Sequence, residues 1–357
     1  MLTRLMLAAI LLPTLSLAQD VHVRVDPSAP HANPGNEDRT IFPTIQNALD
    51  HHPWPGPGGR VYIEIAPGTY NERVIITQNH PNITLIGKGK SPEDVVITNS
   101  LNAKTAGGTF FTETVEINGP GFEADNITFE NAAGNTGQAV AVANRSDRSI
   151  FKRCRFLGHQ DTLFADYGRQ YYVDSYIEGG VDFIFGNAAA VFDRAEIHAN
   201  GPGYVTAQSR TAPNQTTGYV ILNSRITSGI ETSSFDHTAA PMNPATPGAT
   251  SSAAAHNTTG LGRPWRPYSR VIYINTELPA DLNPEGWNNW NNPANEKTAY
   301  YAEANSTGSG AITSASPSTR VPWSHQLTPA EVHEYLPADF LRGPDHWNPE
   351  AEARLLP

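Results

Sequence analysis

Two aspartates recur in similar apolar settings a short interval apart, and acids at such a spacing could act together in catalysis. Asp161 lies within residues 158–164 and Asp182 within residues 180–186. Their separation matches one coil of a parallel β-helix, a solenoid whose turns repeat every twenty-odd positions. Adjacent coils lie about 4.8 Å apart, so the two carboxyl groups could not both ionise freely at neutral pH. The spacing therefore predicts a paired-carboxylate site.

Two glutamines recur at nearly the same interval. Gln138 precedes Gln160 by about one coil, and Gln160 precedes Asp182 by the same interval again. Three consecutive coils would bring these residues and Asp161 onto one face. Side-chain amides beside carboxylates can donate hydrogen bonds to a developing oxyanion. A ladder of polar side chains that satisfy one another is the alternative, and for Gln138 the sequence favours neither.

A cation and a large aromatic residue occur together much later, at residues 261–265. Arg263 could hold a carboxylate with two hydrogen bonds and keep it ionised. Trp265 offers a stacking face to a sugar ring. An isolated Arg-Pro-Trp is more often a surface loop, so the meaning of this segment depends on its position relative to the two acids.

The first residues have the features of an export signal. Residues 5–17 are largely apolar and are followed by a small residue before Gln19. This run is too short to span a bilayer, and no later apolar segment approaches the length that spanning requires. We predict a signal peptide at residues 1–18 and a secreted, monomeric protein with one domain at residues 19–357, without a membrane anchor after signal removal.

The composition narrows the possible partners. The chain has a formal net charge of −11 at pH 7, which argues against nucleic acid as a partner but permits a neutral or partly neutral polymer. Its single cysteine, Cys154, excludes an intramolecular disulfide, and a buried structural thiol is the expected state. Charged residues are only 17%, whereas Gly and Pro number 29 each, which favours strands joined by many turns.

A repeated pair, in which a small or apolar residue precedes a larger apolar one by two places, indicates stacked coils. The pairs recur at intervals near one coil and are Ile127/Phe129, Cys154/Phe156, Ser175/Ile177, Ala195/Ile197 and Ser224/Ile226. Ile83/Leu85 lies about two coils before the first pair. A β-sandwich is the competing fold, but the match with the acid spacing favours a parallel β-helix.

The two ends and one internal segment depart from this pattern. Thr44 precedes apolar residues at helical spacing, so it predicts the N-cap of a short helix that could cover the end of the solenoid. Residues 328–331 form a capping box that would open another short helix. Residues 229–260 lack periodicity and are predicted to loop out. The clearest strand-like runs are at residues 21–25, 61–65, 74–76, 83–87, 95–97 and 271–274.

The order of several motifs resembles a known family. The sequence is similar to the pectin methylesterases, or pectinesterases, over roughly residues 40–325. The segments that carry the resemblance are residues 68–72, 137–140, 158–164, 181–186, 261–265 and 300–308. Ordered blocks of this kind, with the second acid block and Arg-Pro-Trp among them, make coincidence very improbable.

The resemblance implies an all-β, right-handed parallel β-helix with short capping helices. It also implies hydrolysis of the methyl ester at C6 of galacturonate units in pectin, that is, in methyl-esterified homogalacturonan, without a metal or other cofactor. Asp182 would be the nucleophile and Asp161 the acid/base. Gln138 and Gln160 would form the oxyanion site, and Arg263 would hold Asp182. The substrate contacts would be Trp265, Phe185, Val181 and Phe164.

Other functions fit the same residues less well. An inverting glycosidase needs carboxylates spaced for a water and a sugar, yet the two accompanying amides suit an oxyanion better. A lyase needs a basic residue beside calcium-binding acids, and no such acid cluster is apparent. A noncatalytic glycan-binding relative would be favoured if an acid or Arg263 were missing. Three histidines carry little weight as catalytic or ligand residues, namely His159, His237 and His256.

Overall fold

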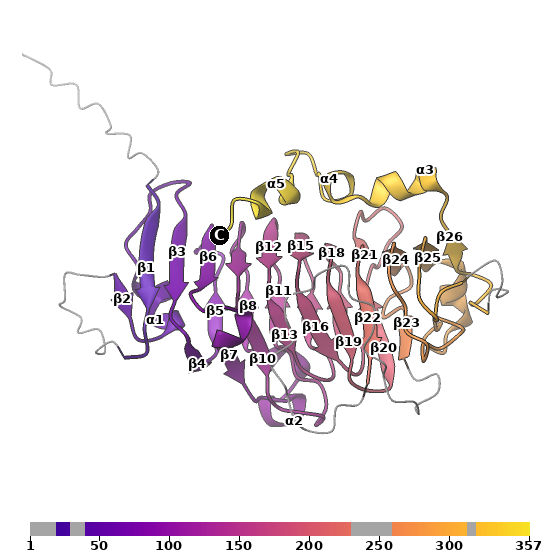
Figure 1. Ribbon diagram of the computed structural model, residues 1–357, viewed down its shortest axis with the longest axis horizontal. Coiled ribbons are helices and arrows are strands. Elements are labelled where there is room, and N and C mark those ends of the chain that lie inside the picture. Colours follow the sequence, from indigo (N-terminus) through magenta and orange to yellow (C-terminus); the bar gives the residue numbers. More distant parts are fainter. Residues whose placement is uncertain (1–18, 29–39, 230–258, 313–318) are drawn as a thin grey trace, which may run out of the picture.

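The computed structural model describes residues 19–28, 40–229, 259–312 and 319–357. These residues form three long parallel sheets, which we call sheets A, B and C (Figure 1). From β3 to β23 each coil contributes one strand to A, the next to B and the next to C, as β12 Ser149–Lys152, β13 Arg155–Leu157 and β14 Leu163–Ala165 do. Because consecutive strands in this stretch belong to different sheets and the strands within each sheet pair in parallel, the chain is a parallel β-helix.

The strands are short, as expected when each coil has to turn three times. Sheet A contains, in order, β2 Ile41–Phe42, β1 Val21–Val25, β3 Val61–Ile65, β6 Ile83–Gly87, β9 Glu123–Asp125, β12 Ser149–Lys152, β15 Arg169–Val173, β18 Ala189–Asp193, β21 Gly218–Leu222, β24 Arg270–Ile274, β25 Tyr300–Ala304 and β26 His325–Gln326. Sheet B contains β22 Arg225–Ser228, β19 Glu196–Ala199, β16 Tyr176–Gly179, β13 Arg155–Leu157, β10 Thr128–Asn131, β7 Val95–Asn99 and β4 Gly68–Asn71. Sheet C contains β23 Thr259–Gly262, β20 Gly203–Gln208, β17 Ile184–Gly186, β14 Leu163–Ala165, β11 Val142–Asn144, β8 Val115–Ile117 and β5 Val74–Ile76.

The repeated pairs fill the interior beneath sheet B. The larger members are fully or almost fully buried and pair from coil to coil in the order Phe129, Phe156, Ile177, Ile197 and Ile226. The assignment of Ile83/Leu85 to this stack is wrong, because both lie on β6 of sheet A. The true predecessor of Phe129 is Ile97, since a long connection inserts extra residues in that coil. Cys154 is buried as predicted, and burial raises the pKa of its thiol.

Short helices lie at both ends and in the connections. The α-helices are α1 Ile45–His51, α2 Ala103–Ala106, α3 Pro329–Val332, α4 Pro337–Phe340 and α5 Pro349–Ala353, and the 3-10 helices are η1 Pro92–Asp94, η2 Thr109–Phe111, η3 Pro293–Lys297 and η4 His333–Tyr335. Thr44 caps α1 as predicted, because its hydroxyl accepts a hydrogen bond from the Asn47 N–H at 3.1 Å. The predicted capping box at Thr328 and Glu331 opens α3.

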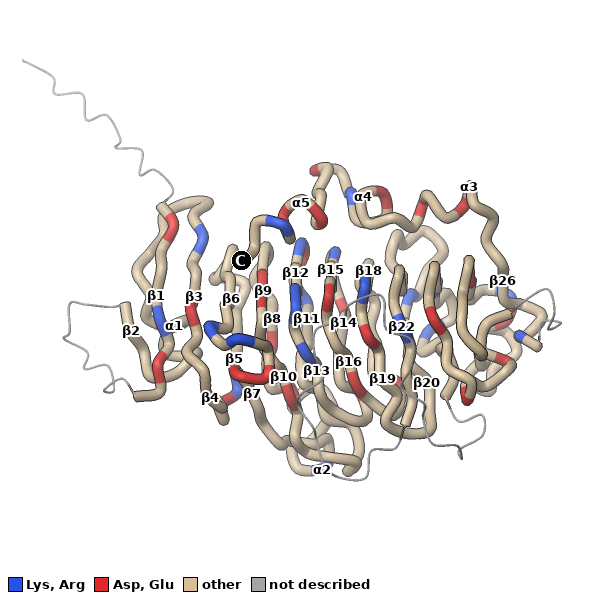
Figure 2. The backbone as a smooth tube through the Cα atoms, viewed as in Figure 1, with Lys and Arg blue, Asp and Glu red and all other residues tan. Residues whose placement is uncertain are grey.

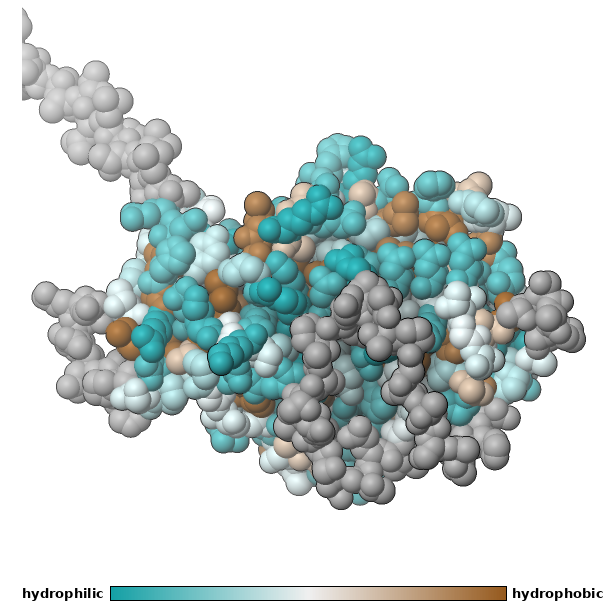
Figure 3. Space-filling view, in the orientation of Figure 1, coloured by the Kyte–Doolittle hydropathy of each residue, from teal (hydrophilic) through white to brown (hydrophobic). Residues whose placement is uncertain are grey.

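The C-terminal segment after β26 was not predicted to contact the solenoid, yet it runs back along the outer face of sheet A (Figure 1). It buries Tyr335, Leu341 and Trp347 against apolar residues of that sheet. In Figure 3 several hydrophobic side chains lie beside this segment, on a face that is mostly hydrophilic. The segment ends where Lys152 Nζ donates to the Leu356 carbonyl at 2.7 Å, so it covers β12 to β25 but not the first strands.

Charged residues of opposite sign lie next to one another on neighbouring strands (Figure 2). Arg194, for example, grips Asp174 with two hydrogen bonds of 2.8 and 3.2 Å one coil away. Such pairing compensates the charges of neighbouring coils on this face.

Some predicted features fall on residues that are not described. The proposed signal at 1–18 and most of the proposed loop lie outside the described residues, as do His237 and His256. The loop was predicted to end at residue 260, but β23 already begins at Thr259. Across the described part of the chain, none of the helices has the length and apolar character needed to cross a membrane.

Candidate active site

The two acids lie in the turns that lead into neighbouring strands of sheet C, directly before β14 and β17. The Asp161 N–H donates to the Val181 carbonyl at 3.1 Å, and the Asp182 N–H donates to the Tyr204 carbonyl at 2.8 Å. Gln160 pairs with Val181 in parallel register, which makes Asp161 level with Asp182 on the next coil. The predicted one-coil spacing of the acids is confirmed.

Both acids have a left-handed backbone, with φ of 65° at Asp161 and 51° at Asp182. This conformation costs most side chains on the order of 1–3 kcal/mol, and Asp and Asn adopt it most readily after Gly. The local turn therefore restricts which residue types fit. Asn is the substitution that removes the charge while keeping the backbone.

Arg263 meets Asp182 with the full fork of its guanidinium. Its Nε and Nη2 donate to the two carboxylate oxygens at 2.8 and 2.6 Å. Asp182 is only 6% exposed, so its carboxyl group is shielded from water, and the cation favours its ionised form. The two residues are far apart in the sequence, and sheet C joins them through β20 and β23.

The guanidinium of Arg263 is held by two aromatic rings that the sequence reasoning missed. Its central carbon lies 4.1 Å from the ring centre of Trp290 and 5.0 Å from that of Tyr204. Cation–π contacts of this kind are worth about 0.5–2 kcal/mol and fix the plane of the fork. The segment 286–290, with tryptophans at positions 287 and 290, was the available signal.

Burial and charge separate the two acids. Burial, followed by repulsion from Asp182, raises the pKa of Asp161 to about 8. Burial also raises the pKa of Asp182, against the hydrogen bonds and charge of Arg263. We expected Arg263 to hold the pKa of Asp182 down, but desolvation outweighs it. Asp182 nevertheless remains the more acidic of the two, because Arg263 hydrogen-bonds only Asp182. Asp161 is therefore the acid that keeps its proton at neutral pH.

The two glutamines lie side by side, and Gln138 pairs with Gln160 in parallel register. Within the described part of the chain, neither side-chain amide has a hydrogen-bond partner, so the alternative of a self-satisfied polar ladder is not what this region forms. The level residue on the third coil is Val181 and not Asp182, so the row predicted through both glutamines and Asp182 is one position out of register. Gln160 directly precedes Asp161 and Gln138 lies one coil away, and both amides remain able to donate.

Aromatic side chains line the sheet beside the acids. Phe164 and Phe185 stack at 4.6 Å between ring centres, and Trp265 lies 5.9 Å from Phe185. Phe164 and Phe185 are each only 4% exposed, so they lie beneath the surface and present little of their rings to a ligand. Phe110, which the sequence reasoning missed, packs on Phe164 at 5.0 Å and is 44% exposed. Its signal was an adjacent pair of phenylalanines at 110 and 111 in a polar stretch.

The sequence around these residues matches a known protein family. A sequence model of the pectinesterase family matches residues 33–344. The chain belongs to the pectinesterase family. It is therefore an enzyme of the esterase class, and the resemblance seen in the sequence is confirmed.

Similar pectinesterases cover most of the chain. "Pectinesterase 31" of Arabidopsis thaliana is 37% identical over 309 residues, which are 84% of this chain and 88% of that relative. The chain spans about half the length of several other plant pectinesterases that it matches. The solved structure of a carrot pectin methylesterase is 34% identical with a TM-score of 0.76, covering 96% of this chain and 98% of that one.

A further solved pectinesterase structure holds a sugar chain. It is described as a pectin methylesterase in complex with a hexasaccharide, and it is 26% identical with a TM-score of 0.70. The comparison covers 93% of this chain and 99% of that chain. These likenesses confirm the parallel β-helix.

Proposed function

We propose that this protein hydrolyses the methyl esters of galacturonate units in pectin and releases methanol, with Asp182 as the nucleophile and Asp161 as the acid/base. The observation that supports this proposal is the difference between the environments of the two acids. One is clamped by Arg263, and the other has a pKa of about 8 with no cation bonded to it. Two carboxyl groups in unequal environments are the arrangement that assigns one to attack and one to proton transfer. The related complex with a hexasaccharide supports a sugar polymer as substrate.

In the first step the ionised Asp182 attacks the ester carbonyl carbon. The negative charge that develops on the carbonyl oxygen receives hydrogen bonds from the amides of Gln138 and Gln160. The bond from the acyl carbon to the methoxy oxygen then breaks, and Asp161 gives its proton to that oxygen. Methanol leaves, and the acyl group remains bonded to Asp182.

In the second step Asp161 is ionised and takes a proton from water. The resulting hydroxide attacks the acyl carbon, and the bond to Asp182 breaks with its electron pair returning to that carboxylate. Asp161 then holds a proton again, and the product carboxylic acid ionises in solvent. The cycle consumes one water and releases one methanol for each ester.

Four side chains are proposed to contact the polymer. Trp265 stands beside the acids on the segment that carries Arg263, and its ring can stack on a sugar. Phe185 and Phe164 pack in the same apolar cluster as Trp265, and the partly exposed Val181 directly precedes Asp182. Phe110 extends this surface by its contact with Phe164.

The decisive experiment offers highly methylated pectin to the purified protein and measures methanol. Methanol without new reducing ends or unsaturated uronate is the expected result. New reducing ends would favour the glycosidase alternative, unsaturated uronate would favour a lyase, and binding without any product would favour a noncatalytic relative.

Replacing Arg263 by Lys is expected to lower turnover about a hundredfold, because the charge stays but the two-point grip on Asp182 is lost. Methanol release and a thermal melt of the same sample check this. Arg194→Lys is a matched control, since Arg194 grips Asp174 with the same fork on the exposed surface and away from the site. Wild-type turnover in a folded Arg263→Lys variant would remove Arg263 from the mechanism.

We further propose that the protein is secreted, with residues 19–357 acting as one monomeric catalytic domain. The N-terminal sequence of exported protein should begin at Gln19 or within a few residues of it, since the apolar run ends there. Edman sequencing or mass spectrometry of the mature protein measures this directly. Secreted protein that keeps Met1 would contradict the signal assignment.

A further inference from the structure

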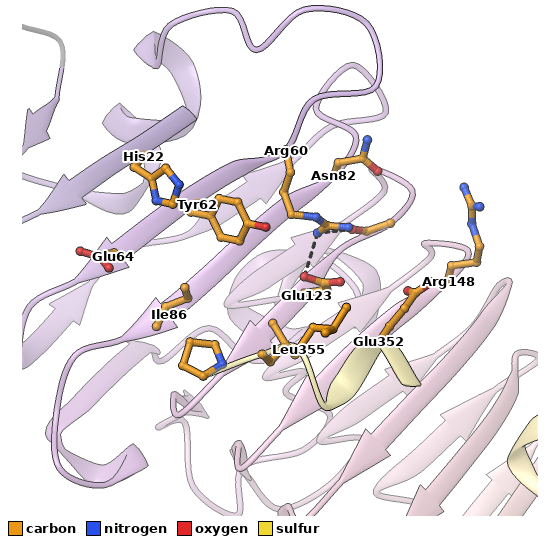
Figure 4. A pocket seen from close by; sticks show the side chains of 13 residues that line it. His22, Arg60, Tyr62, Glu64, Asn82, Ile86, Glu123, Arg148, Glu352 and Leu355 are labelled. Atoms are coloured by element: carbon orange, nitrogen blue, oxygen red, sulfur yellow. Dashed lines mark hydrogen bonds and ion pairs between the residues drawn. The ribbon is translucent and has the colours of Figure 1, made fainter. Parts of the chain in front are cut away.

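A cavity separate from the candidate active site lies at the N-terminal end of sheet A, on the part of its outer face that the C-terminal segment leaves open. It has a volume of about 460 Å³, within the range of small-molecule sites. Strands β1, β3, β6 and β9 form its base, and residues 355–357 border it. Figure 4 shows the side chains around this space.

One wall of the cavity is aromatic. His22 and Tyr62 lie on neighbouring strands with ring centres 4.7 Å apart and planes 9° from parallel. On the other side of Tyr62 the register places Thr84, which is small and fully buried. Because no large side chain stands at Thr84, one face of the Tyr62 ring borders the cavity. Aromatic faces carry partial negative charge and attract the C–H edges of a sugar ring.

Polar atoms surround this aromatic face. Arg60 donates from Nη1 to Thr84 Oγ1 at 2.9 Å and pairs with Glu123 at 2.9 Å, which fixes its position at the edge of the cavity. In Figure 4 the Tyr62 hydroxyl points toward Arg60. Within the described part of the chain that hydroxyl has no hydrogen-bond partner. A ligand lying on the ring would thus find a free hydroxyl and a fixed guanidinium beside it.

Both arginines and two of the three glutamates that line the cavity are already paired with an opposite charge. Glu123 pairs with Arg60, and Glu64 pairs with Lys88 at 3.1 Å. Arg148 pairs with Asp345 at 3.5 Å. Both arginines that line the cavity therefore have a carboxylate partner, and the lining acids outnumber the lining cations. An anionic ligand would compete with these carboxylates, so the site suits an uncharged one.

We propose that this cavity is a second carbohydrate-binding site that holds an uncharged pyranose unit on Tyr62. It lies on sheet A, whereas the two acids lie at sheet C, so it is a separate site and not an extension of the catalytic surface. A methyl-esterified galacturonate unit and a neutral galactose unit share the required chemistry. Naming methyl-esterified galacturonate as a ligand rests on the proposed function, whereas the preference for an uncharged sugar does not.

The test uses the full chain with Asp182→Asn, so that esters survive, and ¹³C-labelled histidine, so that the His22 resonance reports the cavity. Methyl-esterified trigalacturonate, galactotriose and unesterified trigalacturonate are titrated separately. Saturable shifts of the His22 resonance are expected with one or both of the uncharged probes, and not with unesterified trigalacturonate at the same concentrations. The two uncharged probes show whether the methyl ester is needed. Tryptophan fluorescence, from Trp265 and Trp290, reports binding at the acids independently.

Tyr62→Ala should raise the dissociation constant measured at His22 about tenfold, because the stacking face is lost. Tyr62→Phe keeps the face and should raise it less. Trp54→Ala removes an exposed ring that does not line the cavity and should leave it unchanged. An unmoved His22 resonance with both uncharged probes, or equal binding of unesterified trigalacturonate, would overturn the proposal. Neither result touches methanol release by the wild-type protein, so the proposed function is tested separately.

Discussion

Asp182→Asn should lose methanol release from pectin almost completely, by about 10⁵-fold in turnover, because an amide cannot form the acyl intermediate. The fold should survive, since Asn also adopts the left-handed backbone found at this position, with φ of 51°. Arg263 would then face a neutral oxygen in place of a carboxylate and would lose its charge partner. Activity is measured as methanol released, and folding by circular dichroism and a thermal melt.

Asp174→Asn is the matched control for this change. Asp174 has a φ of 50° and accepts two hydrogen bonds from the guanidinium of Arg194. It therefore has the same backbone conformation and the same kind of ion pair as Asp182, but at an exposed position away from the site. The control should keep wild-type turnover and tolerate the substitution. Substantial methanol release by Asp182→Asn, beyond slow deamidation back to Asp, would show that another group attacks the ester.

Asp161→Asn should lower turnover by about 10³-fold and should also change how turnover depends on pH. In the wild type the active form has Asp182 ionised and Asp161 protonated. Turnover should fall on the acid side, as Asp182 is protonated at a pKa above its ordinary value, and above about pH 8, as Asp161 loses its proton. The variant has no proton to lose at this position. Its remaining activity should keep the acid limb and lack the alkaline one.

Protein stability gives a second readout for Asp161. Asp161→Asn should lower turnover but raise stability at alkaline pH. The pKa of the Asp161 carboxyl is raised from 3.8 to about 8 by burial and by Asp182, so the folded protein binds a proton that the unfolded chain releases between these values. Wild-type stability should therefore fall as pH rises from about 4 to about 8. Asp161→Asn should lose this component and melt higher than the wild type above pH 8. An unchanged pH profile of turnover in the variant would exclude Asp161 as the acid/base.

The sequence alone determined the features that depend on local spacing. A coil of a β-helix has to return to the same place, so the one-coil interval in the sequence was enough to predict that Asp161 and Asp182 lie level on neighbouring coils. Capping is also local, and Thr44 and Thr328 open helices as predicted. The same reasoning failed for Ile83/Leu85, because coils of unequal length hide which sheet a pair belongs to.

Only the tertiary structure decided what surrounds those residues. Trp290, Tyr204 and Arg263 come from different coils, and nothing in their spacing shows that two rings enclose one guanidinium. The direction of the pKa shift of Asp182 was mispredicted for a related reason. It depends on how deeply the carboxyl group is buried, which the sequence does not state. The C-terminal segment likewise packs on sheet A through contacts between residues far apart in the chain, such as Lys152 with Leu356. Periodic spacing encodes the coils, whereas desolvation and contacts between distant segments exist only once the coils have stacked.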